Sequence, residues 1–123
     1  MSTDPGSDSN QVRRALDQLR ADALERLRSL EAQADEIAEA RRDSNVDDEH
    51  DPEGSTIAFD HAQTAALAGD ARRQLAEIGA ALERVEQGTY GTCASCGRRI
   101  SAGRLEARPT ASLCVDCQSR AER

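Results

Sequence analysis

The chain has 123 residues, a formal net charge of −7 and an aromatic content of 2%, which leaves too little side-chain bulk for a thick globular core. The charge is uneven, because residues 1–88 carry 10 Arg and 20 acidic residues whereas residues 89–123 carry 6 Arg and 3 acidic residues. Such an acidic body argues against binding to the nucleic-acid backbone and favours a partner with a basic surface.

The N-terminal segment is polar and carries no structural pattern. Residues 1–9 include Pro5 and Gly6, so we expect a disordered tail there. The segment lacks the apolar stretch of a signal peptide, and the sequence nowhere reaches the run of ~20 apolar residues that crosses a membrane. We therefore expect a cytoplasmic protein without membrane contact, in a compartment where disulfides are disfavoured.

Two long segments have the apolar spacing of coiled-coil helices. Residues 10–42 contain neither Gly nor Pro, and a second helix is expected over about 55–87, with Ser55 or Thr56 as its N-cap and Gly88 at its C-terminal end. Apolar residues recur at steps of three and four, which predicts one packed face on each helix. The predicted seam positions are Val12, Leu16, Leu19, Ala23, Leu27, Leu30, Ala34 and Ile37, then Ala68, Ala71, Leu75, Ile78, Leu82 and Val85.

A short polar linker joins these two segments. It contains Pro52 and Gly54, and its shortness favours folding back into an antiparallel helical hairpin over residues 10–88. The predicted fold class is therefore all-α. The same stripes could instead pair with another chain, so a coiled-coil adaptor that dimerises is an alternative, although we expect a monomer.

The expected turn, residues 43–55, gathers negative charge at the tip of the predicted hairpin. Turns are often simply polar and solvated, and that interpretation stays open here. The other interpretation is that the tip presents carboxylates to a partner. The candidate partner-binding residues are Asp47, Asp48, Glu49, Asp51 and Glu53, in a segment that also contains Asp43.

All four cysteines lie near the C-terminus in two C-x2-C pairs, Cys93 with Cys96 and Cys114 with Cys117. This spacing predicts one tetrahedral Zn²⁺ site, and four sulfur ligands leave no open coordination position, so the ion would be structural. Residues 89–123 are thus predicted to form a four-cysteine zinc finger with a short C-terminal helix. The alternatives are two disulfides, a redox-active C-x2-C pair and a zinc thiolate that senses oxidants. The expected cytoplasmic location disfavours the disulfides.

The remaining polar residues do not suggest an enzyme. His50 and His61 are the only histidines, both lie near the turn, and neither accompanies a plausible nucleophile. A DNA-binding zinc finger is a further alternative, but the hairpin is acidic and no predicted helix carries a basic stripe. The DNA-binding alternative is supported by four arginines in the cysteine segment, Arg98, Arg99, Arg104 and Arg108.

The stretch YGTCASCGRRISAGRLEARPTASLCVDC, from Tyr90 to Cys117, resembles the C4 zinc finger of the DksA/TraR family of bacterial transcription factors. The resemblance includes Gly97 after the second cysteine, Ile100, and the run from Arg104 to Pro109. With the helical hairpin before it, the likeness to the longer, DksA-like members covers residues from about 10 to 120.

The resemblance implies a non-catalytic transcription regulator. DksA-like proteins bind RNA polymerase and insert the hairpin into its secondary channel, where acidic tip residues approach the catalytic magnesium and modulate initiation without reading DNA bases. Here Asp48 and Asp51 have the spacing of the family's Asp-x-x-Asp-x-Ala tip motif, with Glu53 in place of Ala. A transcript-cleavage role, with tip carboxylates holding a second Mg²⁺, is a less favoured variant.

The family often acts with guanosine tetraphosphate in the stringent response. The resemblance places Arg108 among the basic residues that this alarmone needs. The comparable part of the second helix offers Gln74 and Glu77 instead of basic side chains. We therefore expect weak or no alarmone binding.

Overall fold

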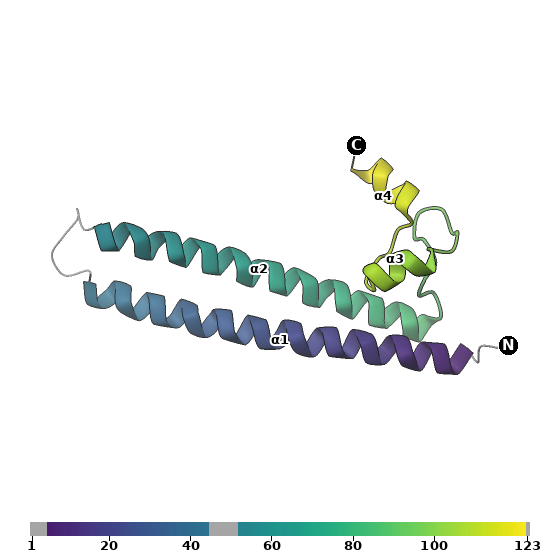
Figure 1. Cartoon of the computed structure of the whole chain (residues 1–123), viewed down its shortest axis with the longest axis horizontal. Coiled ribbons are helices and arrows are strands. Elements are labelled where there is room, and N and C mark those ends of the chain that lie inside the picture. Colours follow the sequence, from purple (N-terminus) through teal and green to yellow (C-terminus); the bar gives the residue numbers. More distant parts are fainter. Residues whose placement is uncertain (1–4, 45–51, 123) are drawn as a thin grey trace. The chain divides into compact units, whose positions relative to one another are not determined.

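The computed structural model describes the backbone of residues 5–44 and 52–122, and the side chains of residues 9–42 and 56–122. Within these ranges it contains the helices α1 (Pro5–Ser44), α2 (Pro52–Gln87), α3 (Ala102–Ala107) and α4 (Val115–Ala121) (Figure 1). The described residues include no β-strand, only an isolated antiparallel bridge between Thr92 and Arg99. The predicted all-α class is confirmed. None of the described helices is both long and apolar enough to span a bilayer.

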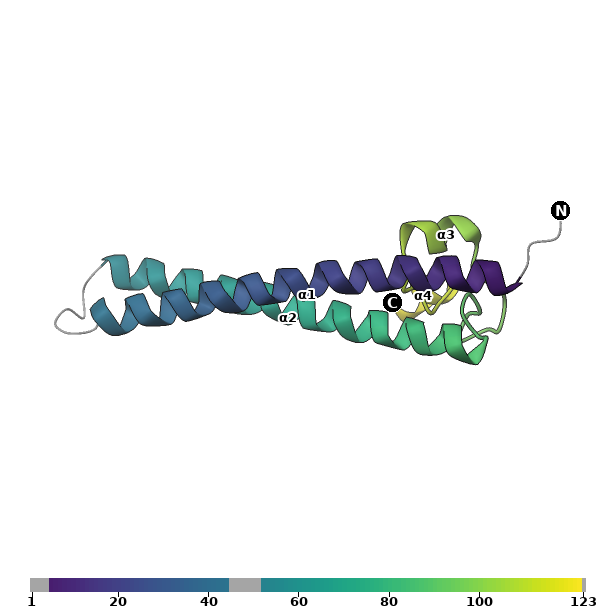
Figure 2. The same cartoon turned by 90° about the horizontal axis from the view of Figure 1, so that it is seen from below.

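The two long helices form the predicted hairpin. The chain divides into two compact units: unit 1 comprises Met1–Arg20 with Ala76–Arg123, and unit 2 comprises Ala21–Leu75. In each unit α1 and α2 lie side by side and run antiparallel (Figures 1 and 2). Every seam position predicted from the apolar spacing is buried or half-buried, so the pattern identified the packed face of both helices.

In unit 2 the buried seam positions carry mostly small side chains. Ala23 of α1 and Ala71 of α2 expose 0% and 1% of their surface. An ion pair of 3.8 Å between Glu31 Oε1 and Arg72 Nη2 joins α1 to α2 at the edge of this seam. Among the side chains that the structure describes in unit 2, the buried ones are Ala23, Leu30, Thr64, Ala68 and Ala71.

The seam of α2 extends further toward the start of the helix than the apolar pattern indicated. Thr64 is 7% exposed, and Ile57 and His61 are half-buried. These positions continue the steps of three and four that begin at Ala68. The apolar pattern left out Thr64 and His61 because both side chains are polar.

In unit 1 larger side chains fill the seam. Leu16 of α1 and Ile78 of α2 are completely buried, and Val85 is 8% exposed. Arg13 Nη2 donates to Glu86 Oε1 across the helix pair at 3.1 Å. Both partners are exposed to solvent, so this bond adds at most about 1 kcal/mol and the apolar seam stabilises the pairing.

The helix ends differ from the expected ones. α1 begins at Pro5, earlier than the expected residue 10, and proline suits the first helical position because its fixed φ is already helical. α2 begins at Pro52, so Ser55 and Thr56 lie inside the helix and do not cap it. Gly88 has φ 77° just after α2, the left-handed conformation expected at that end.

Candidate metal centre

The segment after α2 is tied to the end of that helix. The backbone N–H groups of Thr89 and Tyr90 donate to the Arg84 carbonyl at 2.9 and 3.1 Å. Arg84 Nη2 donates to the Thr110 carbonyl at 3.2 Å, and the Tyr90 hydroxyl donates to the Pro109 carbonyl at 2.7 Å. These bonds hold the four-cysteine segment to the base of the hairpin inside unit 1.

The first cysteine pair lies in a tight loop. The Thr92–Arg99 bridge closes it, Cys93 N–H donates to the Arg98 carbonyl at 2.8 Å, and Gly97 N–H returns to the Cys93 carbonyl at 3.0 Å. Gly97 has φ 76°, a conformation that residues with a Cβ rarely adopt. The loop therefore turns sharply enough to direct both sulfurs of the pair to one side.

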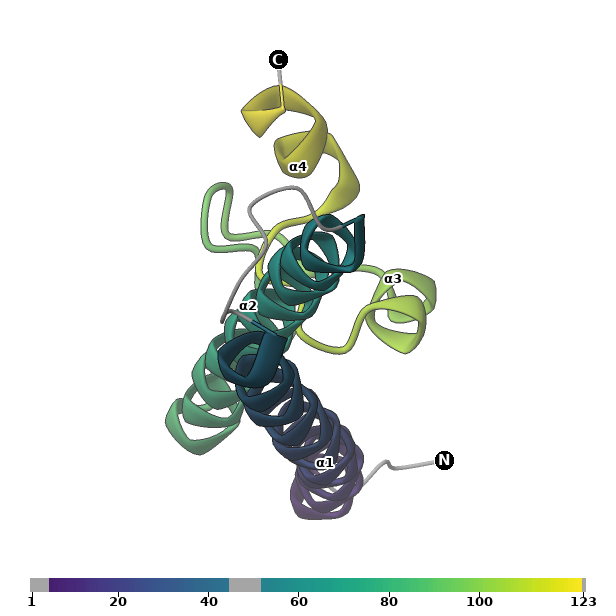
Figure 3. The ribbon, with the colours of Figure 1, turned by 90° about the vertical axis from the view of Figure 1, so that its left-hand side faces the viewer.

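The second cysteine pair lies where α4 begins. Cys114 is the N-cap of α4, and its Sγ accepts a bond from the Cys117 backbone N–H at 3.5 Å. Ala94 N–H donates to the Ser112 carbonyl at 2.8 Å, which joins the two cysteine corners. In the view along the long helices, α4 lies at the top and α3 lies at the right (Figure 3).

The sequence patterns do not predict α3. Ser101 caps it, since its hydroxyl oxygen accepts a bond from Arg104 N–H at 3.2 Å. Arg104 Nε then donates to the Leu113 carbonyl at 2.8 Å, just before the second cysteine pair. The capping serine was a usable signal for a helix start, but six helical residues give too short an apolar pattern to recognise.

The four cysteine sulfurs meet in one cluster. Their Sγ atoms all lie within 4.8 Å of one another. Cys96 Sγ and Cys114 Sγ are 3.8 Å apart. A ZnS₄ tetrahedron with Zn–S bonds of ~2.3 Å has edges of about 3.8 Å, whereas a disulfide bond is only ~2.05 Å long. All four cysteines are free, so the donors fit a tetrahedral zinc ion and the disulfide alternative gains no support.

The electrostatics of the cluster favour a bound cation. Backbone N–H groups, that of Cys96 foremost, donate toward Cys93 and lower the pKa of its thiol to about 6. A hydrogen bond with the Cys114 side chain is the main cause that raises the pKa of Cys117, to about 12, because two neighbouring sulfurs that were both thiolates would repel each other. A divalent cation at the centre would remove this repulsion and stabilise the thiolates.

The apolar core around the sulfurs is small. Cys93, Ile100 and Cys117 are buried, and Leu105, Leu113 and Cys114 pack against them half-buried. Such a core removes little apolar surface from water, so the metal has to supply much of the stability of this segment. With four sulfur donors the site offers no open position for a reacting water molecule.

The structure does not bring the predicted tip residues to this site. Residues 45–51 lie outside the described residues, and with them Asp47, Asp48, Glu49 and Asp51. Glu53 belongs to α2, but its side chain is outside the described ones. The tip assignment therefore stays a prediction, as do the boundaries of the tail, hairpin and finger.

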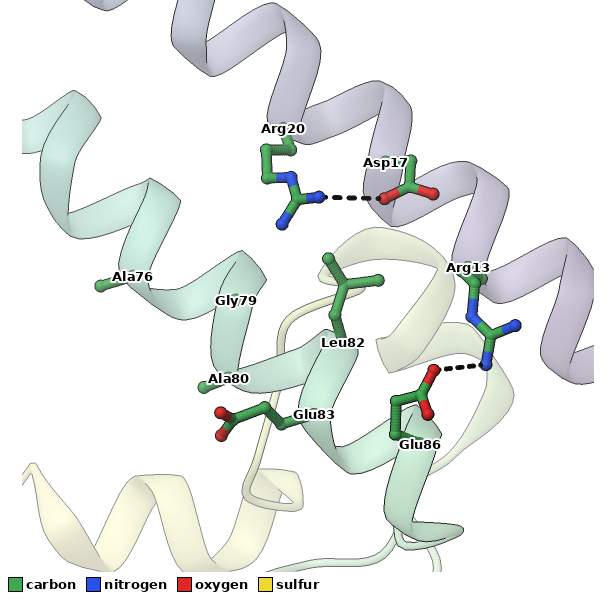
Figure 4. A pocket seen from close by; sticks show the side chains of 9 residues that line it. All are labelled: Arg13, Asp17, Arg20, Ala76, Gly79, Ala80, Leu82, Glu83 and Glu86. Carbon is green, nitrogen blue, oxygen red and sulfur yellow. Dashed lines mark hydrogen bonds and ion pairs between the residues drawn. The ribbon is translucent and has the colours of Figure 1, made fainter.

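A groove of about 680 Å³ lies between α1 and α2 in unit 1 (Figure 4). Arg13 pairs with Glu86 there, and Arg20 Nη2 lies 3.7 Å from Asp17 Oδ1. Acidic and basic side chains both line the groove, and no thiol or imidazole does, so the groove shows neither a charge preference nor a catalytic group. Its lining is Arg13, Asp17, Arg20, Ala76, Gly79, Ala80, Leu82, Glu83 and Glu86.

Comparison with known proteins agrees with this geometry. Residues 88–123 match the family described as prokaryotic dksA/traR C4-type zinc finger. The RNA polymerase-binding transcription factor DksA of Escherichia coli (strain K12) is 49% identical over 51 residues, which are 42% of this chain and 34% of that relative. Its namesake in Caulobacter vibrioides is 50% identical over 52 residues, which are 42% of this chain and 37% of the relative. The matches thus span about a third of the relatives' length.

A solved structure extends the likeness beyond the cysteine segment. Transcription factor DksA2 from Pseudomonas aeruginosa superposes with a TM-score of 0.77 at 26% identity, over 94% of this chain and 84% of that one. The hairpin and the following four-cysteine segment therefore share the DksA2 fold. Together, the C4-type match and the sulfur cluster show a site for one structural zinc ion, as the cysteine spacing predicted.

Proposed function

We propose that the chain is a DksA-like member of the DksA/TraR family and that it is a non-catalytic transcription regulator that binds RNA polymerase. The single observation that carries the proposal is the C4 finger at the base of a helical hairpin with the DksA2 fold. The curated relatives, matched over 42% of the chain, are named RNA polymerase-binding transcription factors.

The zinc ion has a structural role in this proposal. Its ligands are Cys93, Cys96, Cys114 and Cys117, whose sulfurs converge within 4.8 Å. When bound, the ion joins the loop after α2 to the start of α4 and neutralises the thiolates. The cysteines thereby fix the small segment that Arg84 and Tyr90 attach to the base of the hairpin.

We propose that the hairpin enters the secondary channel of the polymerase and modulates initiation. The small seam residues of unit 2, such as Ala23, Ala68 and Ala71, support this idea because small side chains let paired helices approach closely. A slim helix pair suits a confined passage. In this proposal the carboxylates of Asp47, Asp48, Glu49, Asp51 and Glu53 approach the basic, magnesium-containing surroundings of the active site.

The proposed active form is a monomer. In the described parts of both units the apolar stripes of α1 and α2 are buried against each other within one chain, so these stripes are not free to pair with a coiled-coil partner. Weak or no binding of guanosine tetraphosphate is part of the proposal. Arg108 is exposed and available, but Glu77 is exposed too and would repel the alarmone's phosphates.

The DNA-binding alternative loses part of its basis. Of the four arginines that support this alternative, Arg104 donates to the Leu113 carbonyl inside unit 1, which leaves Arg98, Arg99 and Arg108 as its exposed members. Three scattered cations on an otherwise acidic protein are a weak footprint for the nucleic-acid backbone. A gel-shift titration that shows tight DNA binding, lost steeply with salt, would favour this alternative.

Transcription in vitro from a ribosomal-RNA-type promoter tests the proposal. The wild type should bind purified RNA polymerase, compete with another secondary-channel factor and change transcript yield. A variant with Asp47→Asn, Asp48→Asn, Glu49→Gln and Asp51→Asn should bind but lose the effect on yield. The matched control neutralises four exposed acids of α1, by Glu25→Gln, Asp35→Asn, Glu36→Gln and Glu39→Gln. The proposal is refuted if the wild type does not bind RNA polymerase. If the tip variant and the control variant change transcript yield equally, the tip carboxylates have no role beyond that of a solvated turn.

A further inference from the structure

One aromatic side chain of unit 2 lies in solvent. Phe59, the only Phe of the chain, is 68% exposed on α2. Its neighbours in sequence, Ile57 and His61, are half-buried in the seam, and Thr64 is buried there. Since successive helical residues are 100° apart, Phe59 lies on the face of α2 directed away from α1. Packing inside the hairpin therefore does not account for this residue.

The surface around Phe59 combines apolar side chains with the exposed, uncharged Gln63 at i+4. Ala62 and Ala66 follow Phe59 at i+3 and i+7 and are exposed, so they share its face, and Leu67 borders them with 47% exposure. We call the four apolar residues the Phe59 patch. From residue 56 to residue 69 the only Asp, Glu, Lys or Arg is Asp60, whereas the exposed surface of α1 in the same unit is dominated by charged side chains.

A second copy of this chain does not account for the patch. The Phe59 patch, with its exposed Phe side chain, part of Leu67 and two alanines, has about 300 Å² of accessible apolar surface in each copy. Two such patches would bury about 600 Å² in total, well below the roughly 1,200 Å² of a stable specific interface. The patch is instead the size of one anchor inside a larger contact with a different partner.

The geometry and charge also limit what that partner is. A single helix face is convex, so the partner surface has to be concave, and the alanines beside Phe59 let its walls come close to the helix backbone. Asp60 is exposed next to the ring, and the chain carries a net charge of −7, which favours basic groups around the partner's pocket. Large aromatic side chains that fill such pockets commonly dominate binding energy.

We infer that Phe59 is an aromatic anchor that docks into an apolar pocket with a basic rim on RNA polymerase. The inference rests on the proposed function and adds a contact on the side of the hairpin to the acidic tip. Loss of the ring weakens binding by about tenfold or more, as for other buried interface aromatics. Loss of the Asp60 charge weakens binding mainly at low salt, where a basic rim attracts it most.

The experiment measures the affinity of the whole 123-residue chain, loaded with zinc, for RNA polymerase. Phe59→Ala should bind about tenfold or more weakly, Phe59→Leu should be intermediate, and Asp60→Asn should weaken binding at low salt. Leu24→Ala, which removes an exposed leucine from α1 of the same unit, should bind like the wild type. Circular dichroism and zinc content should be unchanged in all variants, because Phe59 makes no seam contact that folding needs.

The outcomes separate this inference from the proposed function. If the wild type binds the polymerase and Phe59→Ala binds equally well, the anchor is refuted and the proposed function stands. If the wild type does not bind, both fail. A wild-type dimer in sedimentation that Phe59→Ala converts to a monomer would overturn the inference by making a second copy the occupant. Tighter binding by Asp60→Asn would refute the basic rim.

Discussion

A glycine in the interior of α2 provides a quantitative test of the packing. Gly79 is half-buried in unit 1, and a Cβ added there would meet no heavy atom within 4 Å outside its own turn of helix. Gly is less favourable than Ala in a helix interior by about 1 kcal/mol, because it gives up more backbone freedom. Since the site is open, we expect Gly79→Ala to raise the free energy of unfolding by about 1 kcal/mol.

Urea and thermal unfolding, followed by circular dichroism on the zinc-loaded protein, measure this change. With an unfolding entropy of about 2 cal/mol/K per residue, the midpoint temperature should rise by roughly 4 °C. The matched control is Gly91→Ala, for which we expect the opposite sign. Gly91 has φ 84°, and its added Cβ would lie 3.5 Å from Leu105 Cδ1, so this variant should lose about 1–2 kcal/mol.

The contrast between the two glycines makes the reasoning refutable. Equal or lower stability of Gly79→Ala would mean that the site is occupied or that the helix is not regular there. A stable Gly91→Ala would mean that the loop before Cys93 does not adopt the left-handed conformation. Either result would contradict the structure at the position tested.

Three further predictions concern the core, the metal and pH. Ile78→Ala removes a completely buried side chain and should cost about 2–5 kcal/mol in urea unfolding, and a loss below 1 kcal/mol would disprove tight packing there. A strong zinc chelator should collapse the NMR dispersion of residues 92–121 while α1 and α2 keep most of their helical signal, and unchanged spectra would disprove a metal-dependent finger. Burial raises the pKa of Tyr90 above 10.0, so the unfolded chain loses the phenol proton first and stability should fall as pH rises above about 10. Tyr90→Phe should remove this slope and cost about 1 kcal/mol through the lost bond to the Pro109 carbonyl, and an unchanged slope would assign it to another group.

Local sequence patterns predicted most of the hairpin. The apolar spacing located the buried face of both long helices, including Leu16 and Ile78, because a regular helix repeats its geometry every few residues whatever it packs against. The cysteine spacing predicted the metal site for a similar reason, since each C-x2-C loop brings two sulfurs to one corner. The same rules failed at His61 and Thr64, where a polar side chain occupies a seam position.

Sequence by itself thus determined the periodic helices, the donor chemistry of the finger and the excess of acid before α2. Only the tertiary structure decided that α1 and α2 pack against each other within one chain, and that two cysteine loops meet with 3.8 Å between Cys96 and Cys114. It also decided that Phe59, an apolar residue that composition alone would place in a core, lies on the outward face of α2. The reason is physical: spacing fixes which side chains share a face of one element, but burial depends on a second element that is distant in the chain.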